Sequence, residues 1–258
     1  MSGRDLFTLK GKAALVTGAA GNVGRQISMA LAQAEAKTFI AGRSLKKLEA
    51  EANALRNQGY DVTALGYDQA QEDSIHALLK EILGRVERID VLVNNAVDRP
   101  MKDWISPAEH FARSMEVNAT GVFLMMRLFG EAMATQGSGS IINISSIQGM
   151  VGPDFTLYEG LDWGTPPDYF FHKAGLISLT RYAAAKLGPH GVRVNAVSPG
   201  GFFNNQDPAF VERYNARTFL GRMASHTDLM GVIVFLASDA SAYITGANIP
   251  VDGGYTAK

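Results

Sequence analysis

The chain of 258 residues contains no cysteine. This absence excludes disulfide bonds, thiolate catalysis and zinc sites built on cysteine. The five histidines are scattered without a paired spacing, so we expect no metal site. A net charge of only −1 gives no reason for attraction to nucleic acid or to an anionic membrane. No apolar run approaches the length of a membrane span, and residues 1–10 lack the apolar core of a signal peptide. We therefore expect a cytoplasmic protein.

The composition itself is ordinary for a globular protein, with 47% hydrophobic and 19% charged residues. Short apolar runs alternate with segments of helical periodicity. The runs predict strands over residues 12–17, 37–41, 62–65, 89–93, 140–144, 192–197 and 248–251. The segments between them predict helices over residues 25–32, 45–58, 71–86, 106–136, 167–188, 207–219 and 227–237. This alternation predicts an α/β fold, a three-layer doubly wound parallel sheet, in a single domain over residues 1–258. Ligands of such sheets bind beyond the carboxyl ends of the strands.

A glycine-rich turn follows the first predicted strand. Gly18, Gly21 and Gly24 lead into a helix, and glycines let a backbone approach a pyrophosphate closely. The amino terminus of the helix adds free N–H groups and a positive dipole end. The turn therefore favours dinucleotide binding, although an ordinary strand-to-helix turn would use the same residues.

The ends of the second and third strands bear on the choice of cofactor. Gly42 and Arg43 stand where an acid would accept a hydrogen bond from the ribose 2′-hydroxyl of NAD, and an arginine suits the 2′-phosphate of NADP. We therefore expect NADP(H) to be favoured over NAD(H). Arg43 could instead stack on adenine or lie at a solvated helix start. Asp68 could accept from the adenine amino group or cap the next helix.

Tyr169 and Lys173 form a candidate acid/base pair. The spacing i, i+4 places both side chains on one face of a helix that begins near Pro166 and Pro167. A neighbouring ammonium favours the phenolate and lowers the tyrosine pKa from about 10. The pair alone could equally be a surface tyrosine and a solvated lysine.

Several motifs together resemble the short-chain dehydrogenase/reductase family over about residues 9–254. They are Thr17-Gly18-Ala19-Ala20-Gly21-Asn22-Val23-Gly24, Asn94-Asn95-Ala96, Asn118, Ser146, Tyr169-x-x-x-Lys173, Asn195 and Pro199-Gly200. The resemblance implies a Rossmann-type fold, a nicotinamide cofactor and a homotetramer. Together with the strand-end residues above, it gives the expected cofactor contacts Gly18, Gly21, Asn22, Val23, Gly24, Arg43, Asp68, Asn95, Ala96, Tyr169, Lys173, Pro199 and Gly200.

The resemblance also implies catalytic roles. Tyr169 would exchange a proton with the substrate oxygen, and Lys173 would lower the pKa of Tyr169 and bind the ribose hydroxyls. Ser146 would hydrogen-bond the reacting oxygen, and Asn118 would hold a water that relays protons from Lys173 to solvent. The implied activity is hydride transfer between the nicotinamide and a secondary alcohol or ketone.

Three features depart from the family pattern. Asn22 and Val97 stand where the family usually has glycine, and Tyr169 follows Ser146 by twenty-three residues, more than is usual. The additional residues form an insertion over residues 150–167 that mixes aromatic rings with carboxylates. Rings can stack on C–H faces and carboxylates can accept from hydroxyls, which favours a sugar or polyol. A surface loop or a subunit contact is the alternative.

The insertion, with Tyr158-Glu159-Gly160, and the later Gly201-x-x-Asn204-Asn205-Gln206 resemble family members encoded for bacterial surface-carbohydrate and sugar metabolism. Two other functions stay open: a carbonyl or 3-oxoacyl reductase for apolar substrates, and a catalytically silent dinucleotide-binding sensor.

The candidate substrate contacts lie after Asn94-Asn95-Ala96, around the insertion and in a lid-like segment, residues 200–225. They are Trp104, Gln148, Tyr158, Phe202 and Phe203. Three arginines near the lid-like segment could meet a phosphate or carboxylate, or simply form a solvated helix face; they are Arg213, Arg217 and Arg222.

Overall fold

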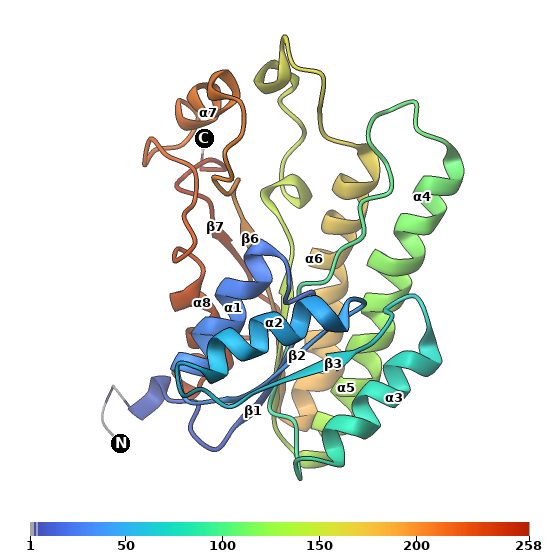
Figure 1. Cartoon of the computed structure of the whole chain (residues 1–258), viewed down its shortest axis with the longest axis vertical. Helices are drawn as coiled ribbons and strands as arrows, with labels where there is room; N and C mark the ends of the chain where they lie inside the picture. The colour runs from blue at the N-terminus through green and yellow to red at the C-terminus, as the bar shows by residue number, and fades with distance from the viewer. Residues whose placement is uncertain (1–2, 4, 258) are drawn as a thin grey trace.

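The computed structural model describes residue 3 and residues 5–257. Its centre is a seven-stranded parallel sheet in the order β3-β2-β1-β4-β5-β6-β7. The strands are β1 (Ala13–Thr17), β2 (Lys37–Gly42), β3 (Val62–Gly66), β4 (Val91–Asn94), β5 (Gly139–Ile144), β6 (Val192–Pro199) and β7 (Asn248–Val251). The predicted doubly wound sheet is confirmed, and all strands end at the same edge (Figure 1).

Helices cover both faces of the sheet (Figure 1). They are α1 (Asn22–Gln33), α2 (Leu45–Arg56), α3 (Glu72–Leu83), α4 (Ala108–Met115), α5 (Val122–Gln136), α6 (Pro167–Leu187), α7 (Pro208–Asn215) and α8 (Met230–Ala237). Within β1, Ala13 and Leu15 pack with α3, α5 and α6, whereas Ala14 and Val16 pack with α1, α2 and α8. Alternate side chains point to opposite faces of a strand, so a strand buried on both faces reads as one apolar run.

The helix expected over residues 106–136 is interrupted by a π-helical segment, Glu116–Gly121. Gln69, in the loop after β3, donates from Nε2 to the carbonyl oxygen of Val117 at 2.9 Å. A Cβ on Gly121 would lie 2.3 Å from the carbonyl oxygen of Gln69, so the backbones approach each other directly there. This contact comes from a distant loop, which is why helical periodicity did not predict the interruption.

Two later helices are shorter than predicted. Helix α7 ends at Asn215 rather than near residue 219, because Thr218 donates back to Asn215 and Leu220 donates to Gly253 beside the sheet. Helix α8 begins at Met230 rather than near residue 227.

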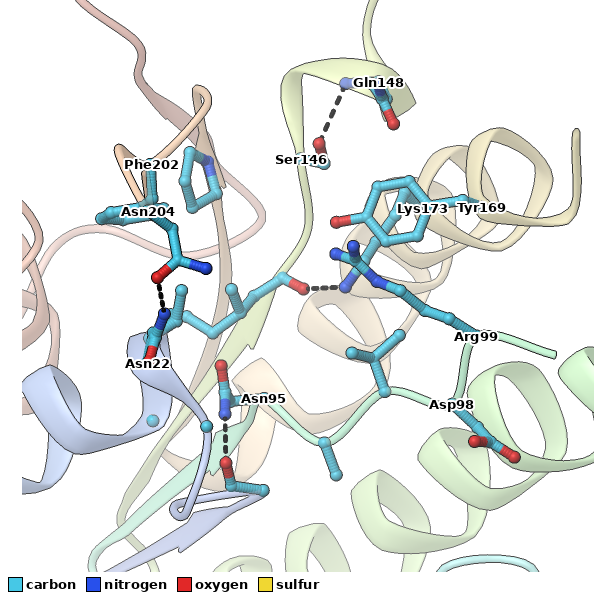
Figure 2. A pocket seen from close by; sticks show the side chains of 18 of the residues that line it. Asn22, Asn95, Asp98, Arg99, Ser146, Gln148, Tyr169, Lys173, Phe202 and Asn204 are labelled. Atoms are coloured by element: carbon cyan, nitrogen blue, oxygen red, sulfur yellow. Dashed lines mark hydrogen bonds between the residues drawn. The ribbon is translucent and has the colours of Figure 1, made fainter. Parts of the chain in front are cut away.

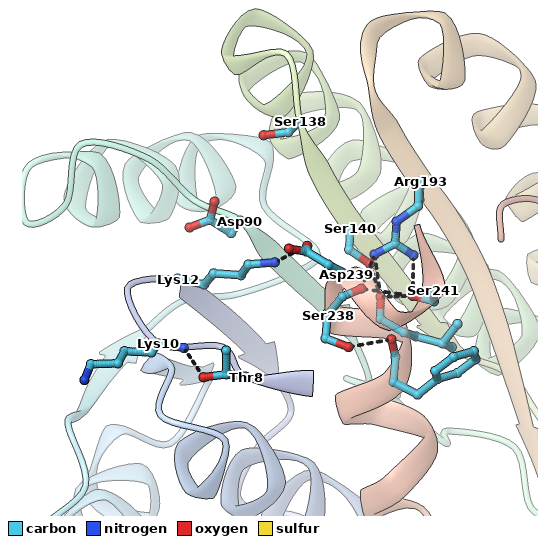
Figure 3. Close-up of polar contacts among 12 residues, drawn as sticks. Thr8, Lys10, Lys12, Asp90, Ser138, Ser140, Arg193, Ser238, Asp239 and Ser241 are labelled. Atoms are coloured by element: carbon cyan, nitrogen blue, oxygen red, sulfur yellow. Dashed lines mark hydrogen bonds and ion pairs between the residues drawn. The ribbon is translucent and has the colours of Figure 1, made fainter. Parts of the chain in front are cut away.

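Polar contacts stabilise the structure near the amino ends of the strands, opposite the cavity (Figure 3). Arg193 on β6 donates to the carbonyl oxygens of Leu236 and Ser238, at 2.8 and 3.2 Å, and so holds the end of α8. Lys12 forms a 2.6 Å ion pair with Asp239. In the part of the chain that the structure describes, no helix has both the length and the apolar character needed to cross a bilayer.

A small third core lies beyond the carboxyl ends of the strands. It joins the insertion to the lid-like segment, which lie at the same end of the molecule (Figure 1). Its buried members are Ile147, Leu157, Phe210, Tyr214 and Met223. We call this cluster the cap core.

Candidate active site

Tyr169 and Lys173 lie on one face of α6, as their spacing predicts, and both line a cavity of about 810 Å³. The Nζ of Lys173 lies 5.5 Å from the centroid of the Tyr169 ring and donates to the carbonyl oxygen of Ile144 at 2.6 Å. Burial raises the pKa of Tyr169, but the charges of Lys173 and Arg99 and hydrogen bonding to Ser146 and Arg99 lower it more, so the pKa is below its ordinary value. The hydroxyl is therefore suited to proton exchange.

Ser146 follows β5 and lines the same cavity. Its Oγ accepts from the backbone N–H of Gln148 at 3.1 Å, which caps a short 3₁₀ helix, Ile147–Gly149. The long insertion loops away from this point, so Ser146 and Tyr169 are neighbours despite their separation in sequence.

Asn118 lies in the π-helical segment and is not among the residues that line the cavity. Its Oδ1 accepts from the backbone N–H of Asp98 at 2.8 Å, and its Nδ2 donates to the carbonyl oxygen of Asp98 at 2.7 Å and to Ser114 Oγ at 3.0 Å. The side chain thus clamps the loop after β4. The water-holding role implied for Asn118 stays a prediction.

Every residue expected to contact the cofactor lines the cavity, which extends from the glycine turn to Tyr169. Gly18 has a φ of +65°, and a Cβ there would lie 2.7 Å from the Cα of Ala96, so only glycine fits. Asn95 donates to the carbonyl oxygens of Thr17 and Gly18, at 2.9 and 3.1 Å, and fixes the turn. Helix α1 begins at Asn22 without a side-chain cap, so its first N–H groups are available to an anion. This cradle fits the pyrophosphate of a dinucleotide.

A hydrogen bond crosses the cavity between the glycine turn and the loop after β6. Asn22 Nδ2 donates to Asn204 Oδ1 at 3.0 Å (Figure 2). The asparagine that replaces the usual glycine therefore links the two walls of the pyrophosphate cradle.

Two strand-end residues line the far end of the cavity. The Arg43 guanidinium lies 3.4 Å from the Asp98 carboxylate. Because the Arg43 side chain is 60% exposed, the guanidinium is still accessible to a ligand. Asp68 accepts from the backbone N–H of Ala70 at 3.0 Å, and the residue before α3 is Gln71, so Asp68 stabilises the preceding turn rather than capping α3.

Comparison with known proteins agrees with this geometry. A protein-family model described as enoyl-(acyl carrier protein) reductase matches residues 18–256. The chain belongs to the short-chain dehydrogenase/reductase family. It is accordingly an NAD(P)-dependent oxidoreductase.

Three relatives illustrate the range of the family around this enzyme. It is 34% identical to the 3-oxoacyl-(acyl-carrier-protein) reductase of Staphylococcus aureus, over 94% of this chain and 97% of that protein. It is 35% identical to an L-rhamnose 1-dehydrogenase (NAD(P)(+)) of Sphingomonas sp., over 95% and 96%. A gluconate 5-dehydrogenase from Burkholderia cenocepacia, solved with NADP and tartrate, is 30% identical with a TM-score of 0.90, over 98% of each chain.

The insertion of this short-chain dehydrogenase/reductase contributes aromatic rings to the cavity. Tyr158 and Trp163 line it, and their rings meet edge to face at a centroid distance of 5.3 Å. Phe210 from α7 completes the cluster at 4.8 Å from Trp163. The carboxylates of the insertion differ from expectation: Asp154, Glu159 and Asp162 are not cavity-lining residues. The expected acceptors for substrate hydroxyls are therefore not supplied by the insertion.

The arginines near α7 hold the insertion in place. Arg217 forms an ion pair with Asp154, and Arg213 donates to the carbonyl oxygen of Glu159 at 2.6 Å. Arg222 pairs with Asp228 at 2.6 Å. Arg213 and Arg217 therefore bind the insertion rather than forming a free anion site, whereas Arg222 binds a carboxylate only six positions further along the chain.

The candidate substrate contacts divide into two groups. Gln148, Tyr158 and Phe202 line the cavity. Trp104 and Phe203 do not line it, and the two residues are 83% and 57% exposed. Ser106 accepts from the backbone N–H groups of Lys102 and Asp103 and so holds the turn that carries Trp104 outward. The backbone of Phe203 bonds to Ala224, which places its ring outside the cavity.

The sequence did not single out Arg99, which lines the cavity beside the acid/base group. The centre of its guanidinium lies 4.5 Å from the centroid of the Tyr169 ring (Figure 2). Its place, three residues after Asn94-Asn95-Ala96 at the end of β4, was the available signal. His172 also contacts Tyr169, with ring centroids 5.2 Å apart. Burial lowers the pKa of His172 to about 3, so it packs as a neutral ring.

We predict a pH dependence that reports the Tyr169 pKa. For alcohol oxidation the phenolate is the base, so kcat/KM should rise with pH through a midpoint below the ordinary tyrosine pKa. Because the charge of Arg99 helps to lower this pKa, Arg99→Gln should move the midpoint to higher pH. Stopped-flow rates over a pH series measure it, and a midpoint that moves to lower pH would contradict the assignment.

We predict that the hydrogen bond between Asn22 and Asn204 strengthens cofactor binding. Asn204→Ala and Asn22→Gly should each raise the cofactor Kd by roughly 2- to 10-fold, because a net hydrogen bond contributes about 0.5–1.5 kcal/mol. Fluorescence titration of the two single variants and the double variant forms a thermodynamic cycle. Strict additivity of the two effects would show that the contact does not act on the cofactor.

Proposed function

We propose that this short-chain dehydrogenase/reductase interconverts a secondary hydroxyl and a keto group in a sugar, a sugar derivative or a polyol, with NADP(H) favoured over NAD(H). The nicotinamide, when bound, supplies or accepts the hydride. Tyr169 transfers the proton to or from the substrate oxygen, and Ser146 hydrogen-bonds that oxygen as charge develops on it. Lys173 keeps the pKa of Tyr169 low through its charge.

The observation that carries the substrate proposal is the aromatic wall of the cavity. Tyr158, Trp163 and Phe210 contact one another and line the space beyond Tyr169. Aromatic faces suit the C–H faces of a carbohydrate, and polar cavity residues such as Gln148 and Asn204 suit its hydroxyls. The L-rhamnose and gluconate dehydrogenases among the relatives support the same substrate class.

Reduction of an apolar or 3-oxoacyl substrate is the second candidate. Phe202 and Met223 line the cavity, and the 3-oxoacyl reductase relative supports it. Two further aromatic residues, Trp104 and Phe203, do not add to the apolar surface of the cavity because they are not among the residues that line it. The complete set of Ser146, Tyr169 and Lys173 at one site argues against a silent sensor. The homotetramer, the cytoplasmic location and the proton relay through Asn118 remain predictions.

A turnover panel tests the proposal. Sugars, sugar acids, polyols, simple secondary alcohols and 3-oxoacyl thioesters are each assayed with both cofactors by the absorbance of the reduced nicotinamide. We expect activity on a polar substrate, and Tyr169→Phe should lower kcat by about 10²- to 10⁴-fold while the cofactor Kd is unchanged. Activity confined to apolar substrates would support the second candidate, and substantial turnover by Tyr169→Phe would remove the catalytic assignment.

A second experiment tests the cofactor preference. Arg43→Asp should raise the Kd of NADPH by about 10- to 100-fold, because a charge-assisted bond to the 2′-phosphate becomes a repulsion. The Kd of NADH should change much less. Lys47→Asp, which reverses a charge at an exposed position on α2, is the control. Equal weakening of both cofactors by Arg43→Asp would reject the role.

A further inference from the structure

Arg99 occupies a fixed position at the reacting end of the cavity. Both backbone polar groups of the preceding residue, Asp98, are bound by the Asn118 side chain at 2.7 and 2.8 Å. Asn118 is itself buried in the π-helical segment. The loop is therefore held directly before Arg99, and the guanidinium extends to 4.5 Å from the centroid of the Tyr169 ring.

The charge of Arg99 is not neutralised by its neighbours. The Asp98 carboxylate points away from Tyr169 (Figure 2) and pairs with Arg43 at 3.4 Å and with Arg113 at 3.5 Å. Among the ion pairs formed within residues 5–257, none includes Arg99. The Lys173 ammonium lies on the same ring at 5.5 Å. Two cations thus border the acid/base group, and the insertion carboxylates that could have balanced them lie outside the cavity lining.

The anionic groups of a dinucleotide belong elsewhere in the cavity. The pyrophosphate fits the glycine turn and the start of α1, and a 2′-phosphate fits Arg43 at the end of β2. Arg99 instead lies beside Tyr169, where the reacting oxygen of the substrate must be. Arg99 is exposed to the open cavity, and a neutral polyol would offer its guanidinium no anionic group to bind.

We propose that Arg99 binds a carboxylate of the substrate, so that the enzyme acts on hydroxy acids or oxo acids of the sugar-acid class rather than on neutral sugars or polyols. The inference rests on the proposed function and narrows its substrate. A planar guanidinium matches a carboxylate through two parallel hydrogen bonds. Its contact with the Tyr169 ring places that carboxylate within a few bonds of the reacting carbon.

The test compares acids with neutral alditols of the same chain length. D-Gluconate is assayed against D-glucitol and D-galactonate against galactitol, and D-glucitol 6-phosphate tests a phosphate as the anion. We expect the wild-type enzyme to prefer the acids in kcat/KM, and Arg99→Gln to lower that preference by about 10- to 100-fold, mainly through KM. Arg85→Gln removes an equal charge in the turn after α3, outside the cavity, and should leave the preference unchanged.

A binding measurement separates this inference from the proposed activity. The same acids and alditols are titrated calorimetrically into Tyr169→Phe with cofactor present, because phenylalanine keeps the ring on which Arg99 lies. Binding of an acid that is lost when Arg99→Gln is added supports the carboxylate site even if wild type turns over nothing, in which case only the proposed activity fails. The inference is overturned by any of three results: wild-type preference for the alditols, an acid preference that Arg99→Gln leaves intact, or no acid binding to Tyr169→Phe. Arg99 dependence seen with the phosphate alone would also overturn it.

Discussion

The buried ammonium of Lys173 is the constraint around which the site is built. An isolated charge in a protein interior is costly, and Lys173 is only 5% exposed. The carbonyl oxygen of Ile144, at the end of β5, accepts from it at 2.6 Å. Ser145 donates to the carbonyl oxygen of Lys173 at 2.8 Å, so β5 and α6 are joined at the same residue. These hydrogen bonds stabilise the buried lysine. They also bring Ser146, the residue after Ser145, close to Tyr169.

The substrate side of the cavity is a single unit built from two distant segments. The insertion between Ser146 and Tyr169 and the helix α7 share the cap core, and Arg217 binds Asp154 across them. The rings of the insertion line the cavity, whereas the carboxylate of Asp154 is bound by Arg217, which follows α7. Movement of α7 would therefore carry the insertion with it.

Electrostatics differ between the two ends of the cavity because of one carboxylate. Asp98 pairs with Arg43 near the expected adenosine and with Arg113 on α4, and its backbone is clamped by Asn118. Its neighbour Arg99 lies beside Tyr169 and does not form an ion pair with Asp98. Val97, which stands where the family usually has glycine, directly precedes this pair.

The fold and the shared face of Tyr169 and Lys173 could be predicted from the sequence because both depend on local patterns, whereas Ser146 and Asn118 were singled out by the family resemblance. A strand buried on both faces must be apolar throughout, so the positions of the strands along the chain could be predicted without tertiary information. Residues four apart on a helix share a face, so the same is true of the placement of Tyr169 and Lys173. The tertiary structure alone decided which loop side chains enter the cavity. It turned Trp104 and Phe203 outward, bound Arg217 to Asp154 and brought Arg99 to Tyr169. Loop directions are set by partners far away in the chain, such as Asn118 holding Asp98, and no short-range periodicity records them.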